Sequence, residues 1–361
     1  MRREVTGEKM SVRSYVQVPV SEGENVRRIL AEWGLLDREH KPVVEGGSLL
    51  LPLVDGSLPT VKKLLQGTAG VVTGHRRFES TDRRSKTLAE ALKEILTPSE
   101  LELLPRAYDL IGNIAVLEIP DEIEHHAEVI GEAFLSIHPN FTTVLAKKGA
   151  ISGTKRTRKY RFLAGDKTTR TIHREYGCRF VVDLEQAYFS PRLLEEHNRV
   201  AGLTQDGECV IDMFCGVGPF SIHIAKSRRA KVIAVDINPA AISLLKESLK
   251  LNRLLGEVVP VVADIREYLS SYDGDAVDRV IMNHPSGASS FVGDACRVLR
   301  PSGTMHYYDF VGGPRPEATL QSKIMELVHQ AGHRVLEITA VRRVRDSAPR
   351  EYQMVADVVI H

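Results

Sequence analysis

The chain of 361 residues has few cysteines and lacks any long apolar run. Its four cysteines, Cys178, Cys209, Cys215 and Cys296, form no Cys-x-x-Cys spacing, so we expect no disulfide framework, no zinc site and no metal. The apolar stretches, such as residues 258–263, are far shorter than the roughly 18 residues of a membrane span. The N-terminus carries charges where a signal peptide has an apolar segment. These absences predict a cytoplasmic protein with reduced thiols.

The chain also lacks a net charge of either sign. It has 48 Lys and Arg against 47 Asp and Glu, a net charge of +1, and no global field that would attract nucleic acid. The balance hides one strongly basic stretch, because residues 147–174 hold ten Lys and Arg against Asp166 alone, a local charge of +9. The rest of the chain therefore sums to about −8. The near-zero net charge therefore does not exclude a contact between this basic stretch and phosphate groups.

The length predicts two or three domains. Residues 14–20 alternate as a strand does, residues 25–33 have helical spacing, and residues 48–54 form a strand between glycine turns. These patterns predict a small α+β domain over residues 1–86. It ends in a linker or surface arm over residues 76–86, where five residues are basic and few are apolar.

A second α+β domain is predicted over residues 87–190. Thr97, Pro98 and Glu100 supply the cap, the first-turn proline and the acid that a helix start requires. After this helix we expect a strand, an amphipathic helix and a second strand, over residues 109–119, 121–135 and 142–146.

The third domain, residues 191–361, alternates strands with helices. We expect strands over residues 209–213, 231–236, 258–262, 279–282, 304–310 and 355–360, and helices over residues 221–226, 240–251, 291–299 and 317–331. Such alternation predicts an α/β fold with an open, mostly parallel, doubly wound sheet.

The first strand of this domain leads into a glycine turn. The segment from Asp212 to Ser221 reads Asp-Met-Phe-Cys-Gly-Val-Gly-Pro-Phe-Ser, and Gly216 and Gly218 allow the backbone to pass close beneath a ligand. Amides at the following helix start offer donors to polar ligand groups. Taken alone, this pattern fits a plain structural turn equally well.

Acids follow the next two strands. Asp236 lies 20 residues after Gly216, at the strand end where a ribose diol can donate to a carboxylate. Asp264 follows the next apolar strand and can accept a hydrogen bond from an adenine amino group. Each acid alone could merely cap a helix. Acids at three consecutive strand ends favour a nucleoside ligand.

The glycine motif departs from the dinucleotide pattern GxGxxG, because Pro219 follows the second glycine and Ser221 replaces the third. It resembles instead the class I S-adenosylmethionine-dependent methyltransferases, which imply a Rossmann-like domain. From this resemblance we predict S-adenosyl-L-methionine as the cofactor. The residues expected to bind it are Asp212, Phe214, Gly216, Gly218, Asp236, Asp264 and Asn283.

The fourth strand ends in Asn283-His284-Pro285, at the edge where a doubly wound sheet opens its ligand crevice. In amino-methylating enzymes of this class, an Asn/Asp-x-Pro turn lies beside the methyl group that is transferred. An ordinary strand-ending turn has the same pattern, so the turn alone leaves both interpretations open.

Further segments resemble one family, the archaeal and eukaryal type of tRNA (guanine-37, N1)-methyltransferase, over roughly residues 108–352. The matching segments are Ile-Gly-Asn-Ile-Ala from Ile111, His-Pro-Asn from His138, Arg-Thr-Arg from Arg156, Leu-Ala-Gly from Leu163, Thr-Ile-His-Arg-Glu from Thr171, Tyr-Phe-Ser-Pro-Arg from Tyr188, the glycine motif, Asn283-His284-Pro285, His-Tyr-Tyr from His306 and Ala-Pro-Arg from Ala348. His284 departs from the family, which usually has Leu there.

The resemblance implies roles for individual residues. Guanine N1 carries a proton, so methylation needs a base and a donor to O6. The family position of the base is Glu196, with the adjacent Glu195 as a rival; on a helix, neighbours point about 100° apart, so only one faces the pocket. Arg156 is expected to support charge on O6. Asn283 and Pro285 complete the predicted catalytic set.

The basic stretch then predicts RNA contact. The expected RNA-binding residues are Lys155, Arg156, Arg158, Tyr188 and Arg192. The partner implied is tRNA, recognised in part by the first domain, with the protein a monomer and no obligate protein partner. Two alternatives stay open: an aminocarboxypropyl transferase or bifunctional carbon methyltransferase of tricyclic-guanosine (wyosine) synthesis, and a non-catalytic tRNA-binding protein.

Overall fold

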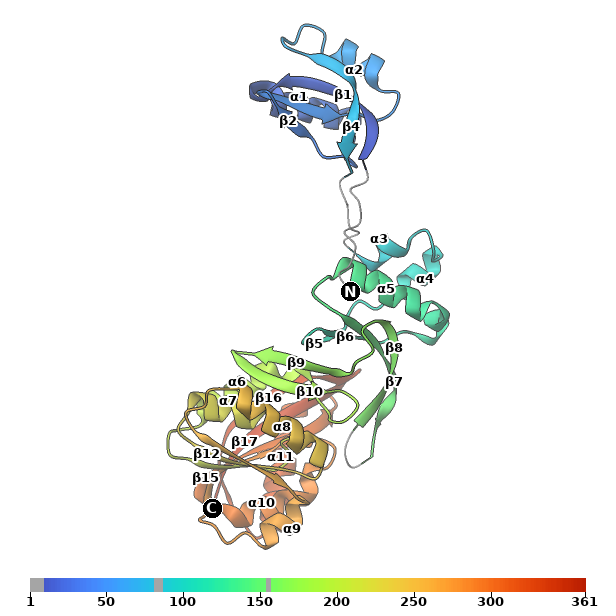
Figure 1. Cartoon of the computed structure of the whole chain (residues 1–361). Helices are drawn as coiled ribbons and strands as arrows, with labels where there is room; N and C mark the ends of the chain where they lie inside the picture. Colours follow the sequence, from blue (N-terminus) through green and yellow to red (C-terminus); the bar gives the residue numbers. More distant parts are fainter. Residues whose placement is uncertain (1–9, 81–86, 154–156) are drawn as a thin grey trace. The chain divides into compact units, whose positions relative to one another are not determined.

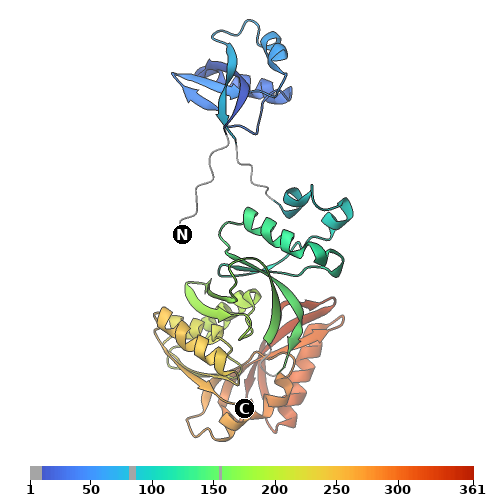
Figure 2. The same cartoon turned by 45° about the vertical axis from the view of Figure 1, so that its right-hand side comes forward.

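The computed structural model describes residues 10–80, 87–153 and 157–361. The chain divides into two compact units, one up to Ser85 and one from Lys86 onward (Figures 1 and 2). The predicted boundary near residue 190, inside the second unit, stays a prediction.

The first unit is an antiparallel sheet with two helices. Its elements are β1 (Met10–Pro19), α1 (Val20–Glu32), β2 (Val43–Glu45), β3 (Ser48–Pro52), α2 (Leu58–Leu64) and β4 (Val72–Glu79), with strand order β2-β3-β1-β4. Val16, Leu30 and Leu51 are fully buried in its core. The predicted linker from residue 76 is wrong at its start, because Arg76 and Arg77 pair with β1 as part of β4. Residues 81–86 of that linker lie outside the described residues.

The second unit starts with short helices and a four-stranded sheet of order β5-β6-β7-β8. Its elements are α3 (Leu88–Leu92), α4 (Pro98–Glu102), β5 (Asp109–Ile111), β6 (Ile114–Leu117), η1 (Asp121–His126), α5 (Ala127–Ile137), β7 (Thr143–Ser152) and β8 (Thr157–Gly165). The predicted helix start at Thr97 is confirmed as a full capping box with Glu100. The single strand expected over residues 109–119 is wrong: Gly112, at φ +57°, turns the chain into a hairpin.

A two-stranded ribbon, β9 (Arg170–Glu175) and β10 (Cys178–Asp183), leads to η2 (Pro191–Leu193) and α6 (Leu194–Leu203). Phe180 and Val182 of β10 pack into the same apolar cluster as α8.

The large sheet has seven strands in the order β13-β12-β11-β14-β15-β17-β16. The strands are β11 (Cys209–Asp212), β12 (Lys231–Asp236), β13 (Glu257–Val262), β14 (Val277–Met282), β15 (Leu299–Gly312), β16 (Val335–Ala348) and β17 (Glu351–Ile360), and the helices are α7 (Pro219–Ser227), α8 (Pro239–Leu251), α9 (Ile265–Ser270), η3 (Ala288–Phe291), α10 (Val292–Val298) and α11 (Pro316–Gln330). The first five strands in this order pair in parallel and the last two antiparallel. The predicted doubly wound sheet is confirmed.

Helices cover both faces of this sheet (Figure 1). Side chains of α9, α10 and α11 share one apolar cluster with β14 and β15. Side chains of α6, α7 and α8 belong to the clusters on the opposite face. The sheet therefore presents the carboxyl ends of β11 to β14 at a common edge, where its ligand crevice opens.

Candidate active site

A cavity of about 250 Å³ lies at the carboxyl ends of β11, β12, β13 and β14. The connection from β10 to α6 and two residues of the β16–β17 hairpin close its other side. Its lining comprises Tyr188, Phe189, Ser190, Leu193, His197, Met213, Phe214, Cys215, Gly216, Val217, Pro219, Phe220, Asp236, Ile237, Asn238, Ala241, Ala263, Asp264, Ile265, Asn283, His284, Pro285, Phe291, Arg345 and Gln353. The predicted glycine loop, Asp236, Asp264 and the Asn-x-Pro turn thus meet in one pocket.

The glycine loop is fixed by the acid of the neighbouring strand. Asp236 accepts hydrogen bonds from the backbone amides of Gly216 and Asn238, each at 2.8 Å. Gly216 (φ +53°) and Gly218 (φ +80°) both adopt left-handed backbone conformations, which glycine reaches without a Cβ penalty. Burial raises the pKa of Asp236. Its carboxylate shapes the loop and at the same time forms part of the pocket wall.

Asp212 lies beneath this loop, outside the pocket lining. One carboxylate oxygen accepts a hydrogen bond from the Ser221 hydroxyl at 2.7 Å, and the other is buried with no hydrogen-bond partner among the described residues. Burial raises the pKa of Asp212 to about 7. Direct contact of Asp212 or Gly218 with a cofactor stays a prediction.

Asp264 also lines the pocket and caps α9, where it accepts from the Arg266 amide at 2.8 Å. Phe291 belongs to the same lining, with its ring centroid 5.2 Å from that of Phe214, and the Arg266 guanidinium lies over the Phe291 ring. An apolar slot with a carboxylate at its rim suits a flat heterocycle that carries an amino group.

A hydrogen-bond chain from the β16–β17 hairpin holds the Asn-x-Pro turn. Gln353, only 1% exposed, donates to Asn283 Oδ1 at 3.1 Å and accepts from Arg345 Nε at 2.6 Å. Arg345 also donates to the Tyr188 hydroxyl at 3.2 Å. The Asn283 oxygen is thereby occupied and its NH₂ group is left to serve the pocket. Sequence reasoning missed Arg345 and Gln353, because nothing in their local pattern marks them.

The two candidate bases on α6 differ in environment. Glu195 is exposed and contacts the Tyr176 hydroxyl, whereas Glu196 is 2% exposed. Glu196 accepts from Arg199 at 2.7 and 2.9 Å and from the Tyr308 hydroxyl at 2.6 Å. Of the two, Glu196 faces inward. Neither side chain belongs to the pocket lining.

Glu196 is one end of a buried chain of charges. Arg199 also donates to Asp357, which accepts from His306 Nδ1 at 2.6 Å. Burial raises the pKa of Asp357, but the hydrogen bonds from His306 and Arg199 lower it by a larger amount. The pKa of Asp357 therefore lies below its usual range. This chain fixes α6 to β15 and β17 behind the pocket.

A second buried carboxylate, Glu175, reaches the pocket through His197. His197 Nδ1 lies 2.8 Å from one Glu175 oxygen and His223 Nε2 lies 3.3 Å from the same atom, while His173 Nε2 lies 3.4 Å from the other oxygen. Burial raises the pKa of Glu175, but the hydrogen bonds from these histidines lower it by a larger amount. The pKa of Glu175 therefore lies well below its usual range. The ionised carboxylate therefore accepts a hydrogen bond from the Nδ1–H of His197, whose own pKa is lowered by burial.

His197 Nε2 is thus a lone-pair acceptor. It is buried, has no hydrogen-bond partner among the described residues, and belongs to a side chain of the pocket wall. The ring packs edge-on against Phe220, in the first turn of α7 just after the glycine loop. A ligand that brings an N–H or O–H group to this end of the pocket would satisfy it.

The predicted RNA-binding residues are only partly brought together. Tyr188 lines the pocket, and Arg192, nearby on η2, is half-exposed and donates to Asp109 at 2.7 Å. Arg158 lies on β8. Lys155 and Arg156, including the predicted O6 donor, lie outside the described residues.

These features define a class. A cradle of two left-handed glycines, strand-end carboxylates at Asp236 and Asp264, an apolar slot and orphaned acceptors fit a nucleoside cofactor that carries a charged amino acid chain, as in class I S-adenosylmethionine-dependent methyltransferases. In the described part of the chain, no helix is long and apolar enough to cross a membrane.

Comparisons with known proteins place the chain within this class. Residues 171–340 match the TRM5/TYW2 methyltransferase domain, residues 88–168 the TYW2 N-terminal domain, and residues 16–59 the tRNA methyltransferase 5 N-terminal domain. The tRNA (guanine(37)-N(1))-methyltransferase Trm5b of Pyrococcus abyssi is 40% identical over 95% of this chain and 97% of its own length. The chain belongs to the TRM5/TYW2 methyltransferase family.

Solved structures of members of this family have a similar fold. A complex of aTrm5 with tRNALeu is 33% identical, covers 96% of this chain and 99% of its own, and superposes with a TM-score of 0.73. A Methanocaldococcus jannaschii TYW2 structure in complex with AdoMet is 26% identical, covers 71% of this chain and 99% of its own, and has a TM-score of 0.54. A tRNA(Phe) (4-demethylwyosine(37)-C(7)) aminocarboxypropyltransferase of the same organism is 30% identical over 69% of this chain and 96% of its own length.

Proposed function

We propose that this protein transfers the methyl group of S-adenosylmethionine to N1 of guanosine 37 in tRNA. The observation that carries the proposal is the 40% identity to Trm5b over 95% of the chain, first domain included. The aminocarboxypropyltransferase relative is less similar and matches a smaller share of the chain. The Asn283-His284-Pro285 turn, which the pocket presents beside the glycine loop, supports methyl transfer over that alternative.

Different residues of the pocket would bind different parts of the cofactor. The cofactor supplies a methyl group bonded to a positively charged sulfur. Asp236 would accept from the ribose hydroxyls, and Asp264 from the adenine amino group. At the methionine end, His197 Nε2 would accept from the ammonium group, because it is a buried acceptor of the pocket wall that has no donor among the described residues.

Side chains of the protein would then orient the guanine and remove its N1 proton. Asn283, oriented by Gln353, presents its NH₂ group to the base, and Pro285 forms the wall beside it. Arg345 brings a fixed positive charge to the same wall and can support charge on O6 together with Arg156. Glu196 would accept the N1 proton, which requires that its contact with Tyr308 or Arg199 opens when the base enters.

Binding of tRNA is proposed to combine the basic strands β7 to β9 with the first unit. Within the described part of the basic stretch, ion pairs join Lys147 to Asp109, Arg161 to Glu124, and Arg170 to Glu247. The remaining charge is sufficient for several phosphate contacts, which give affinity without reading sequence. We also propose that the protein is cytoplasmic and a monomer. Light scattering of the purified protein would measure its oligomeric state.

Mass spectrometry of the product nucleoside tests the reaction. The protein is incubated with cofactor and a tRNA transcript that has an unmodified guanosine 37, and in parallel with a transcript that carries a wyosine precursor. A methyl group on the guanosine transcript supports the proposal. An aminocarboxypropyl group on the precursor, or no product on either transcript, contradicts it.

A further inference from the structure

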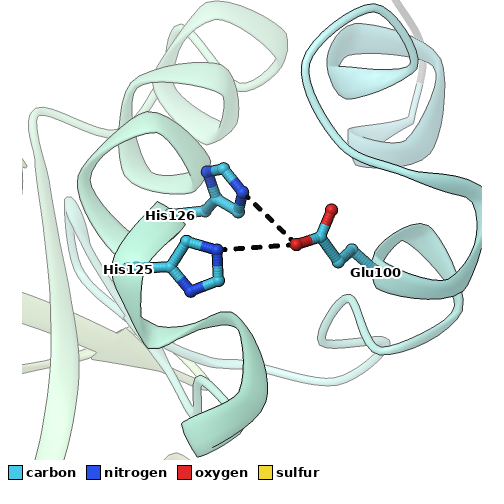
Figure 3. Close-up of side chains that lie close together, drawn as sticks. All are labelled: Glu100, His125 and His126. Atoms are coloured by element: carbon cyan, nitrogen blue, oxygen red, sulfur yellow. Dashed lines mark ion pairs between the residues drawn. The ribbon is translucent and has the colours of Figure 1, made fainter.

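One cluster of metal-ligating side chains lies outside the active site. Glu100, on α4, faces His125 and His126, the last two residues of η1 (Figure 3). Glu100 Oε1 lies 3.5 Å from Nε2 of each histidine. Neighbouring residues thus direct the same ring atom at a single carboxylate oxygen.

The other oxygen of Glu100 is already committed. Oε2 accepts from the Thr97 amide and from the Thr97 hydroxyl, each at 2.8 Å, which completes the capping box of α4. The cap therefore fixes the side chain and leaves Oε1 directed at the two imidazoles.

The separations suit a metal better than hydrogen bonds. At 3.5 Å, each O···N distance exceeds the roughly 2.7–3.2 Å of a good hydrogen bond. Ligands at about 2.0–2.1 Å from a tetrahedral Zn²⁺ are separated by about 3.3–3.4 Å along each edge of the tetrahedron. The three ligand atoms all lie within 4.8 Å of one another. Small side-chain adjustments would place them around one ion.

Ring geometry and access point the same way. The two imidazole rings lie 4.1 Å apart between centroids, so one ion can reach a nitrogen of each ring. The side chain of His125 is 62% exposed, and those of His126 and Glu100 are 23% and 22% exposed. Water can therefore enter and complete the coordination.

The buried cluster of Glu175, His197 and His223 meets the same proximity criterion but is a weaker candidate. All three residues are at most 3% exposed. The neighbouring His173 accepts from the Gly112 amide through Nδ1, which leaves its Nε2 a proton donor toward Glu175 rather than a ligand. In that cluster Glu175 Oε2 already lies at hydrogen-bond distance, 2.8 and 3.3 Å, from His197 and His223, whereas Glu100 Oε1 lies 3.5 Å from each histidine of the exposed cluster.

We propose that Glu100, His125 and His126 bind one divalent transition-metal ion of borderline softness, Zn²⁺ foremost, with water in the remaining position. One carboxylate and two imidazoles are ligands that Zn²⁺ prefers. The ion would join α4 to the segment that starts α5, two parts of the domain that are separate in sequence. Its role is to stabilise this domain, and it is independent of methyl transfer.

Zinc binding to the full, tag-free chain tests the proposal, after treatment with a chelator. Titration calorimetry should give one site of micromolar Kd, and added Zn²⁺ should raise the temperature of unfolding. Glu100→Gln keeps a cap-competent side chain but removes the charged ligand, and His126→Ala removes an imidazole. Each variant should bind at least about tenfold more weakly.

Two control variants carry equivalent changes away from the cluster. Glu102→Gln alters an exposed acid of the same helix, and His329→Ala removes an exposed histidine of α11. Both should bind Zn²⁺ as the unmodified chain does. Absence of micromolar binding in the unmodified chain overturns the proposal, and so does equal binding by Glu100→Gln and His126→Ala, which would place the ion elsewhere. A cooperative unfolding transition without metal confirms that each variant is folded.

Discussion

Glu196 and His197 are neighbours on α6 and serve different partners. Glu196 faces Arg199 and Tyr308, whereas His197 lies in the pocket wall and is oriented by Glu175. Glu196 is buried and Glu195 is exposed, but neither lines the pocket, so the assignment of the base to Glu196 stays a prediction.

Glu196→Gln tests the base directly. The amide retains the shape and can still accept from Tyr308, but it cannot take a proton from guanine N1. We expect the single-turnover rate of methyl transfer to fall by about 10²–10⁴-fold. Binding of S-adenosylhomocysteine should not change, and Glu195→Gln, which alters the exposed neighbour, should react at the normal rate. An unchanged rate in Glu196→Gln would remove this residue from the mechanism.

His197→Asn tests the ammonium contact. The Asn amide can replace Nδ1 as donor to Glu175, but nothing replaces the Nε2 acceptor. Loss of a hydrogen bond to a charged group costs about 1.5–3 kcal/mol, so S-adenosylhomocysteine should bind about 10–100-fold more weakly by calorimetry.

Methylthioadenosine, which lacks the amino acid part, should bind His197→Asn and the unmodified chain equally. His223→Gln, which keeps a donor to Glu175 and lies outside the pocket lining, serves as the control and should bind both ligands normally. Equal losses of affinity for the two ligands would show that His197 only supports the fold.

Among the elements, the β16–β17 hairpin closes the pocket, and it was the hardest to predict. Sequence patterns indicated β17 in part and missed β16, because β16 has no fully buried position and no regular alternation, and its pairing with β17 shifts register at several points. Gln353 and Asn283 are 70 residues apart, so no local pattern could join them. By contrast, β11 to β14 are apolar runs with polar residues at their ends, which is why the glycine loop, Asp236 and Asp264 were predictable.

Gln353→Leu tests the function of this hairpin. The substitution keeps the approximate volume but releases the Asn283 amide and the Arg345 guanidinium. We expect kcat to fall about tenfold or more, because a misplaced group near the reacting atoms loses its orientation. Affinity for S-adenosylhomocysteine should remain, since Gln353 hydrogen-bonds to Asn283 and Arg345 rather than to Asp236 or Asp264. Unchanged kcat would mean that Asn283 needs no support from β17.

At the scale of the whole molecule, the near-zero net charge conceals a basic stretch of +9, part of which is neutralised internally. Ion pairs of this kind are invisible in sequence, because Glu124, Asp109 and Glu247 come from other elements. The partial neutralisation limits non-specific attraction while leaving exposed cations such as Lys148 and Lys159, which pair in register on β7 and β8.

Salt dependence of tRNA binding measures how many cations contact phosphates. We expect log Kd to rise linearly with log salt, and the double variant Lys148→Gln/Lys159→Gln to lower the slope by about two, because each substitution removes one cation from a phosphate. Lys231→Gln, which alters an exposed cation of β12, should leave the slope unchanged. A slope that is the same in the double variant would place the RNA elsewhere.

The most direct test of the account locates the methyl group on the tRNA. A methyl on N1 of guanine blocks the base-pairing edge, so reverse transcription of a treated transcript should stop at position 37 only when active protein and S-adenosylmethionine are both present. A transcript with adenosine at position 37 should give no stop. Read-through at guanosine 37, or methylation at another position, would contradict the assignment of this pocket to guanine-37 N1 methylation.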